Sequence, residues 1–149
     1  MAKVVVANDH GAVELAQRIV RHLENRGYEV TYPGTATEES VDYPDKAEEA
    51  CLEYLKGGYE FGVVCCGTGI GISMAANKIR GIRCALVCDK YSAEMTKRHN
   101  NPSFIAFGGR MDYRDSIEDM LDAFINADFE GGRHTRRIEK LMALENIEA

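Results

Sequence analysis

The chain contains no apolar stretch of membrane-spanning length and no excess of positive charge. Its 149 residues include 18 Lys and Arg against 24 Asp and Glu, a formal net charge of -6. A negative overall field disfavours nucleic acid and anionic membranes as partners, so an anionic ligand needs a local cluster of cations. Near the N-terminus only residues 4–7 form an apolar run, which is too short for a signal-peptide core. We therefore expect neither a membrane nor a nucleic-acid partner.

The chain also lacks the even set of cysteines that a disulfide framework needs. It has five, and two of them are adjacent in a segment with the pattern of a buried strand: Cys51, Cys65, Cys66, Cys84 and Cys88. This usage indicates reduced thiols and a cytoplasmic location. Cys84 and Cys88 lie on one predicted strand with three residues between them, a poor arrangement for a metal ion, so we expect both in the core.

No internal repeat, linker or low-complexity segment divides residues 1–149, so we expect a single domain. Short apolar runs alternate with segments of helical periodicity. We expect strands at residues 4–7, 28–32, 61–66, 82–88 and 103–107, and helices near residues 13–23, 47–55, 70–79, 92–98, 117–125 and 134–147. This alternation predicts a three-layer α/β/α sandwich around a five-stranded parallel sheet. The last helix has no strand after it, and its amphipathic pattern suits either its own sheet or a partner subunit.

Unusual residues gather around the strand ends, the edge at which open parallel sheets bind ligands. Residues 8–11 (Asn-Asp-His-Gly), 66–71 (Cys-Gly-Thr-Gly-Ile-Gly) and 108–110 (Gly-Gly-Arg) each follow a predicted strand. Residues 99–100 (His-Asn) precede the fifth strand, and residues 131–134 (Gly-Gly-Arg-His) open the last helix. Three of the four histidines fall in these segments.

The turn after the third strand is the most informative of these segments. Gly67, Gly69 and Gly71 allow close approach of a ligand to backbone N–H groups at a helix N-terminus, which suits an oxyanion. A tight turn without a ligand would explain the glycines equally well. Cys66 favours the functional interpretation, because a thiolate is stabilised at a helix N-terminus and acts as a base or nucleophile. Strand alternation turns Cys65 to the opposite face, where we expect inert packing.

Two arginines near the start of the last helix suggest anion capture. Arg133 and Arg137 are four residues apart and share one helix face. Solvent exposure is the commoner fate of arginine, but the preceding glycines and the adjacent His134 favour a binding role. Two other candidates also have simpler interpretations, since Asp9 with His10 could cap the first helix and His99 could be a surface residue.

Motifs of other proteins with this architecture are missing. A dinucleotide fingerprint would need a third glycine where Ile72 stands, and a phosphate-binding loop would need Gly-Lys-Ser/Thr. A cysteine phosphatase loop would place arginine at position 71 or 72, and a phosphorylation receiver would end the third strand with aspartate rather than Cys66. What remains is a cysteine-bearing, oxyanion-binding turn with acid/base residues and a cationic pair for phosphate.

Taken together, these segments closely resemble the type B ribose-5-phosphate isomerases, a family that also contains galactose-6-phosphate and allose-6-phosphate isomerases. The match covers essentially the whole chain and includes residues 9–10, 42–44, 66–73, 75–78, 81–83, 99–100 and 131–134. The resemblance implies a Rossmann-like sandwich, proton transfer between C1 and C2 of an open-chain sugar phosphate through a cis-enediolate, and no metal or other cofactor. It also implies a homodimer or a dimer of dimers with shared active sites, to which the C-terminal helix would contribute.

The resemblance also implies roles for individual residues. Cys66 is the expected base, and Thr68 with the amides of residues 67–71 is expected to hold the developing enediolate oxygen. Asp9 and His99 resemble the ring-opening groups. The expected phosphate ligands are His10, Arg110, Arg133 and Arg137, and the matched segments add two further substrate contacts, Tyr43 and Asn100. Some relatives replace the cysteine by a glutamate a few residues later, but this chain has Ile72 and Ser73 there.

Three functions remain open from the sequence. The first is isomerisation of ribose 5-phosphate, and the second is the same chemistry on allose 6-phosphate or galactose 6-phosphate. The third is a non-catalytic sensor of sugar phosphates, which would have no need of a thiol base. Nothing in the sequence measures the length of the pocket, so it does not distinguish five from six carbons.

Overall fold

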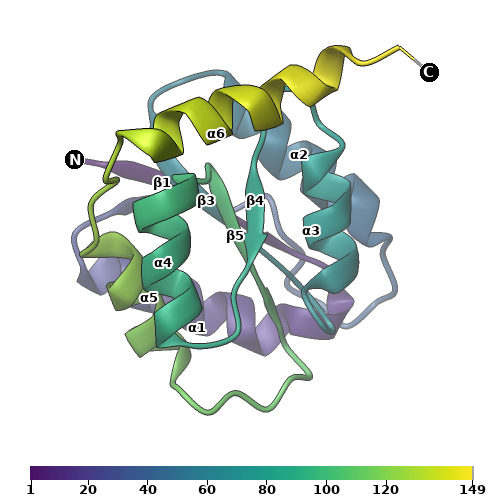
Figure 1. Cartoon of the computed structure of the whole chain (residues 1–149). Helices are drawn as coiled ribbons and strands as arrows, with labels where there is room; N and C mark the ends of the chain where they lie inside the picture. The colour runs from purple at the N-terminus through teal and green to yellow at the C-terminus, as the bar shows by residue number, and fades with distance from the viewer. Residues whose placement is uncertain (149) are drawn as a thin grey trace.

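Five parallel strands form one sheet in the computed structural model, which describes residues 1–148 (Figure 1). The strands are β1 (Lys3–Asn8), β2 (Glu29–Thr31), β3 (Tyr59–Cys66), β4 (Cys84–Leu86) and β5 (Phe104–Gly108). Their order is β2-β1-β3-β5-β4, and every neighbouring pair is parallel. This confirms the predicted five-stranded parallel sheet.

Helices cover both faces of the sheet. Alternate residues of β1 point to opposite sides, so Val4 and Val6 join one apolar cluster while Val5 and Ala7 join the other. The first cluster packs under α1 (Val13–Asn25), α4 (Lys90–Asn100) and α5 (Ile117–Ile125). The second packs under α2 (Tyr43–Leu55) and α3 (Ile70–Asn77). The predicted three-layer sandwich is therefore confirmed.

The last helix, α6 (Arg133–Ala143), crosses the amino ends of the strands, opposite the arrowheads in Figure 1. It continues as a short 3-10 turn, η2 (Leu144–Asn146), rather than as one helix to residue 147. Hydrogen bonds tie η2 to the turn that follows α3, since Gly81 N–H donates to Glu145 Oε1 at 2.8 Å and Arg80 Nη1 donates to Asn146 Oδ1 at 3.0 Å. No helix within residues 1–148 has both the length and the apolar composition to cross a membrane.

Strand β4 is shorter than the sequence pattern predicts. It lies at the edge of the sheet and pairs with β5 alone, over Cys84–Leu86 instead of residues 82–88. Cys88 therefore lies beyond the strand, in the turn into α4, where its N–H donates to Ser92 Oγ at 3.0 Å. The expectation that Cys88 belongs to the core is wrong, because the residue is exposed. Cys84 is half-buried against the second apolar cluster.

Candidate active site

The candidate site lies where the sheet changes direction. From β1 the chain moves outward to β2 on one side and then returns to β3 on the other side of β1. The turns that follow β1 and β3 are therefore neighbours, and a crevice opens between such turns in parallel sheets. Here the two turns are joined directly, because Asp9 N–H donates to the carbonyl oxygen of Cys65 at 3.0 Å.

A third turn, after β5, completes this edge. Gly109 N–H donates to the carbonyl oxygen of Cys66 at 2.8 Å, and Arg110 N–H donates to that of Gly67 at 2.9 Å. The backbones approach so closely that a Cβ atom on Gly11 would lie 2.9 Å from the Gly67 nitrogen. Glycine is therefore required where the turns cross, and backbone hydrogen bonds hold the three loops in fixed relative positions.

Cys66 ends β3 at the centre of this edge and is 5% exposed. Gly69 N–H donates to its sulfur at 3.2 Å, and α3 begins at the next residue. Backbone dipoles at such a helix start favour negative charge on the sulfur. Cys65 points to the other face and is fully buried, as predicted. Burial, followed by the neighbouring Cys66, raises the pKa of the Cys65 thiol, so Cys65 stays protonated near neutral pH.

Thr68 and Tyr43 flank the start of α3. Thr68 is exposed, and its Oγ1 accepts a hydrogen bond from Ile70 N–H at 3.2 Å. Tyr43 is the first residue of α2, and a Cβ on Gly71 would lie 2.8 Å from Cζ of its ring. The ring therefore lies against the first turn of α3. Because the amides of Gly69 and Ile70 are already engaged, Gly71 N–H is a suitable donor for an oxyanion here.

Asp9 and His10 follow β1 on the same edge. Asp9 is 7% exposed, and its Oδ1 accepts a hydrogen bond from Gly11 N–H at 2.8 Å. The capping interpretation of Asp9 is therefore confirmed, although the capped element is the short 3-10 helix η1 (His10–Ala12). The side chain of His10 reaches the loop before α2, where Nδ1 lies 3.2 Å from the backbone of Val41.

A buried polar network that the sequence analysis overlooked supports Asp9. Asn8 is fully buried, and its Nδ2 donates to the carbonyl oxygens of Asp9 at 2.8 Å and Thr35 at 3.0 Å. The hydroxyl of Tyr32 donates to Asn8 Oδ1 and also reaches the Thr35 carbonyl. Burial raises the pKa of Tyr32, so the phenol remains a donor. The sequence marks Asn8 as a polar residue at the end of an apolar strand, but no local pattern reports its contacts with Tyr32 and Thr35, which lie more than twenty residues later.

Arg110 supplies positive charge at this edge. It is exposed, and a Cβ on Gly67 would lie 3.4 Å from its Nη1, so the guanidinium is beside the turn that follows Cys66. We call the edge of the sheet at which the strands end the carboxyl edge. Most of the predicted site residues lie there: Asp9, His10, Tyr43, Cys66, Gly67, Thr68, Gly69, Gly71 and Arg110.

The remaining predicted residues lie at the opposite, amino edge. His99 and Asn100 end α4, and Arg133 with Arg137 lies on the first turns of α6. Both arginines are exposed, whereas the His99 ring stacks on that of His134 with centroids 4.2 Å apart. The end of α4 and the start of α6 lie at the opposite end of the sheet from the carboxyl end of β3, where Cys66 stands, so the structure does not bring the two groups together within one chain (Figure 1).

Comparisons with known proteins agree with this geometry. Residues 4–141 match the model of the family described as Ribose/Galactose Isomerase. Ribose-5-phosphate isomerase B of Escherichia coli is 40% identical, over 97% of each chain. D-erythrulose-4-phosphate isomerase of Pectobacterium atrosepticum is 34% identical, over 99% of this chain and 98% of the relative. The structure of ribose-5-phosphate isomerase B from Mycoplasma genitalium with bound ribulose 5-phosphate has a TM-score of 0.90 and 32% identity, covering 98% of this chain and 97% of that chain. This chain therefore belongs to the ribose/galactose isomerase family.

Proposed function

We propose that the protein interconverts ribose 5-phosphate and ribulose 5-phosphate in the cytoplasm. The observation that carries this proposal is the sulfur of Cys66 at the start of α3, held by Gly69 N–H at 3.2 Å among three hydrogen-bonded turns. Two of the similar proteins are named ribose-5-phosphate isomerases, and one of them holds ribulose 5-phosphate. The five free thiols support the cytoplasmic location.

In the proposed reaction the Cys66 thiolate removes the proton from C2 of the open-chain aldose. The electron pair left on C2 forms the C1–C2 double bond of an enediolate, and negative charge develops on O1. A proton then passes from O2 to O1 as the C2=O2 bond forms, and the same thiol returns a proton to C1, which takes up the electron pair of the C1–C2 double bond to give the ketose. The Thr68 hydroxyl and the N–H of Gly71 in the first turn of α3 donate to the oxygen on which charge develops. Each such donor is typically worth ~10²–10³ in rate.

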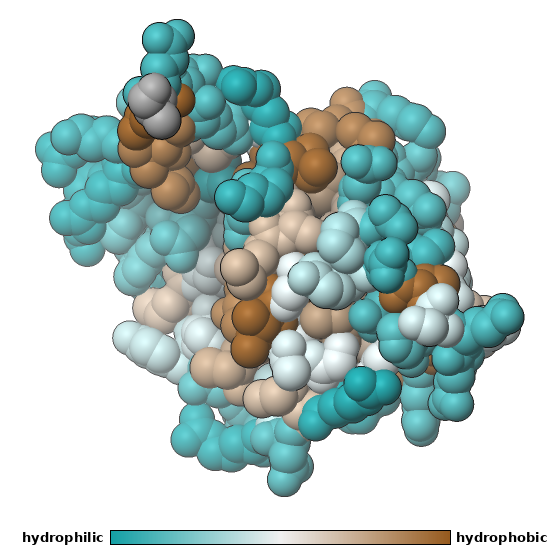
Figure 2. All heavy atoms as spheres, turned by 90° about the vertical axis from the view of Figure 1, so that its right-hand side faces the viewer, coloured by the Kyte–Doolittle hydropathy of each residue, from teal (hydrophilic) through white to brown (hydrophobic). Residues whose placement is uncertain are grey.

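The phosphate requires cations from both edges of the sheet. His10 and Arg110 are at the carboxyl edge, but Arg133 and Arg137 lie at the other edge of the same chain. We therefore propose a homodimer in which the partner subunit supplies the arginines and His99. Exposed apolar side chains support a partner surface on α2, α3, α6 and η2: Leu52, Leu55, Ile70, Met74, Leu141 and Leu144. Figure 2 shows several apolar patches among hydrophilic side chains on the right-hand side of the molecule in Figure 1.

The number of carbons in the substrate must be tested directly, because one relative is named for a four-carbon sugar phosphate. The decisive experiment compares kcat/KM for ribose 5-phosphate, D-erythrulose 4-phosphate, allose 6-phosphate and galactose 6-phosphate. We expect the highest value for ribose 5-phosphate. A higher value for another sugar would reassign the substrate within the same chemistry. Tight binding of sugar phosphates without turnover would instead identify a sensor.

A further inference from the structure

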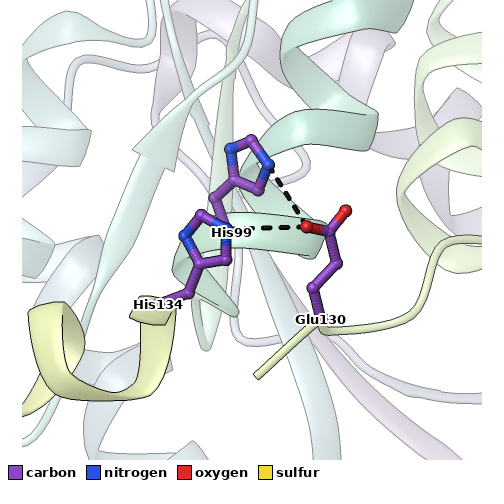
Figure 3. Close-up of side chains that lie close together, drawn as sticks. All are labelled: His99, Glu130 and His134. Atoms are coloured by element: carbon purple, nitrogen blue, oxygen red, sulfur yellow. Dashed lines mark ion pairs between the residues drawn. The ribbon is translucent and has the colours of Figure 1, made fainter. Parts of the chain in front are cut away.

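Two histidines and a glutamate form a compact cluster at the amino edge, outside the turns around Cys66 (Figure 3). Oε1 of Glu130 lies 3.7 Å from Nε2 of His99 and 3.5 Å from Nε2 of His134. The two imidazole rings are stacked, with an interplanar angle of 10°. One carboxylate oxygen therefore faces both rings from the loop that precedes α6.

The carboxylate of Glu130 is fixed from its other side. Arg98 Nε donates to Glu130 Oε2 at 2.6 Å, and Glu130 N–H donates to the Arg98 carbonyl oxygen at 3.0 Å. Arg98 is itself anchored, because its Nη1 donates to Glu94 at 3.1 Å. These bonds leave Oε1 of Glu130 directed at the histidines.

The two histidines are not equivalent. His134 is 5% exposed, and its buried Nε2 has no hydrogen-bond partner among residues 1–148. Burial first, and then repulsion from His99 and Arg133, lower the pKa of His134, so its ring is neutral near pH 7. The His99 side chain is 37% exposed, and its second ring nitrogen points away from Glu130 (Figure 3). His99 is thus the ring that can exchange a proton with a ligand, and His134 is a neutral surface on which it stacks.

The stack does not have the geometry of a preformed metal centre. A metal ion lies in the plane of each imidazole that binds it, along the direction of the nitrogen lone pair. Two nearly parallel rings with centroids 4.2 Å apart share no such point unless one of them turns. A carboxylate beside an imidazole is instead the arrangement that orients a general base and stabilises the imidazolium that forms.

We infer that Glu130 is a positioning residue that holds His99 for opening of the sugar ring. This inference rests on the proposed isomerase function. In ring opening, His99 Nδ1 takes the proton from the anomeric hydroxyl O1, and the O1–H electron pair forms the C1=O1 bond. The C1–O4 bond breaks with its electron pair on O4, which takes a proton from water or the Asp9 carboxyl. Glu130 Oε1, 3.7 Å from Nε2 of His99, keeps a proton on that nitrogen and faces the imidazolium that forms.

The test compares a sugar that must be opened with one that has no ring. Ribose 5-phosphate is cyclic, whereas D-erythrose 4-phosphate carries its phosphate on O4 and forms no five-membered ring. We expect Glu130→Gln to lower kcat/KM for ribose 5-phosphate about 10- to 100-fold, within the usual range for acid/base groups. For erythrose 4-phosphate the loss should stay below about threefold. Glu118→Gln, which weakens an exposed arginine–glutamate ion pair outside this network, that with Arg18, should leave both values near wild type.

A second readout uses ribulose 5-phosphate, which is also acyclic. Exchange of its C1 hydrogen with deuterium oxide requires enediolate formation but no ring step, so Glu130→Gln should retain the exchange rate while losing net formation of ribose 5-phosphate. Equal losses in exchange and conversion, or none in either, would overturn the inference. A wild-type protein that isomerises none of these sugar phosphates would instead refute the proposed function itself.

Discussion

The two edges of the sheet hold their polar groups in different ways. At the carboxyl edge, backbone hydrogen bonds of 2.8–3.0 Å join three glycine-containing turns, and Asp9 and Cys66 are almost buried. At the amino edge, Arg133 and Arg137 project from α6 into solvent, and only His134 in that helix is buried. The first edge is preorganised within one chain, whereas the arginines of the second form no ion pair within residues 1–148.

The distance between the edges explains why neither is sufficient alone. Strand β3 has 8 residues, and at ~3.3 Å per residue it separates the edges by roughly 23 Å. A sugar phosphate is far shorter than this, so one molecule of it does not touch both edges of one sheet. We therefore expect the carboxyl edge to perform the proton transfer and the amino edge of a second chain to bind and open the sugar.

The largest expected effect comes from Cys66→Ala. Removing the thiol should lower kcat for ribose 5-phosphate by about 10³-fold or more, because the base that moves the proton is lost. The folded state should persist, since the turns are joined by backbone bonds that do not involve the side chain. Kinetic assays with circular dichroism measure both properties.

Cys65→Ala is the matched control for this prediction. Cys65 is adjacent in sequence but fully buried on the other face of the sheet, where its pKa is raised. We expect its removal to reduce stability slightly through lost packing and to leave kcat within a few-fold of wild type. Similar losses of activity in the two variants would remove Cys66 from its assigned role.

Sequence patterns predicted the carboxyl edge better than the amino edge, for a physical reason. Strand, turn and helix around Cys66 are consecutive, so periodicity and glycine spacing identify them locally. The cluster of His99, Glu130 and His134 joins α4 to a loop about thirty residues later, and no local pattern reports that contact. The exposure of Cys88 was missed because periodicity does not reveal which strand lies at the edge of a sheet.

A smaller effect is expected from Arg137→Ala at the amino edge. A charge-assisted contact to phosphate is worth about 1.5–3 kcal/mol, so KM should rise about 10- to 100-fold. The effect on kcat should be smaller if the phosphate is bound equally along the reaction. Steady-state kinetics separate the two parameters, and a change confined to kcat would argue against phosphate binding by this arginine.

Mixing two inactive variants tests whether the edges belong to different chains. Cys66→Ala subunits lack the base, and Arg133→Ala/Arg137→Ala subunits lack the arginines. In a mixed dimer with shared sites, one site carries both defects and the other carries none. Mixed dimers should therefore regain up to about half the activity of one wild-type dimer. If activity does not return after verified subunit exchange, each site is built within one chain.

Gly71→Ala probes the contact between α2 and α3 at the carboxyl edge. The added methyl would lie 2.8 Å from the Tyr43 ring, which is 42% exposed and can swing aside. We expect kcat/KM to fall by about tenfold, since the ring is displaced from the start of α3. Stability should change by less than about 1 kcal/mol, because alanine suits a helix better than glycine. Adding Tyr43→Ala to this variant should cost little more, as two changes to one contact are not additive.

The smallest effect concerns the buried histidine of the amino edge. The pKa of His134 lies below the ordinary value of about 6.5 because burial, His99 and Arg133 disfavour its charged form. Below about pH 6.5 the unfolded chain therefore binds more protons than the folded one at this residue, and stability falls as pH falls. His134→Gln has no such proton to bind. Urea unfolding measures the free energy of unfolding of both proteins. The difference between them should be constant above about pH 7.5, and between about pH 7.5 and pH 5 the wild type should lose more stability than the variant. A difference that does not vary with pH would mean that the cluster tolerates a charge on His134, and the neutral platform assigned to His99 would then be wrong.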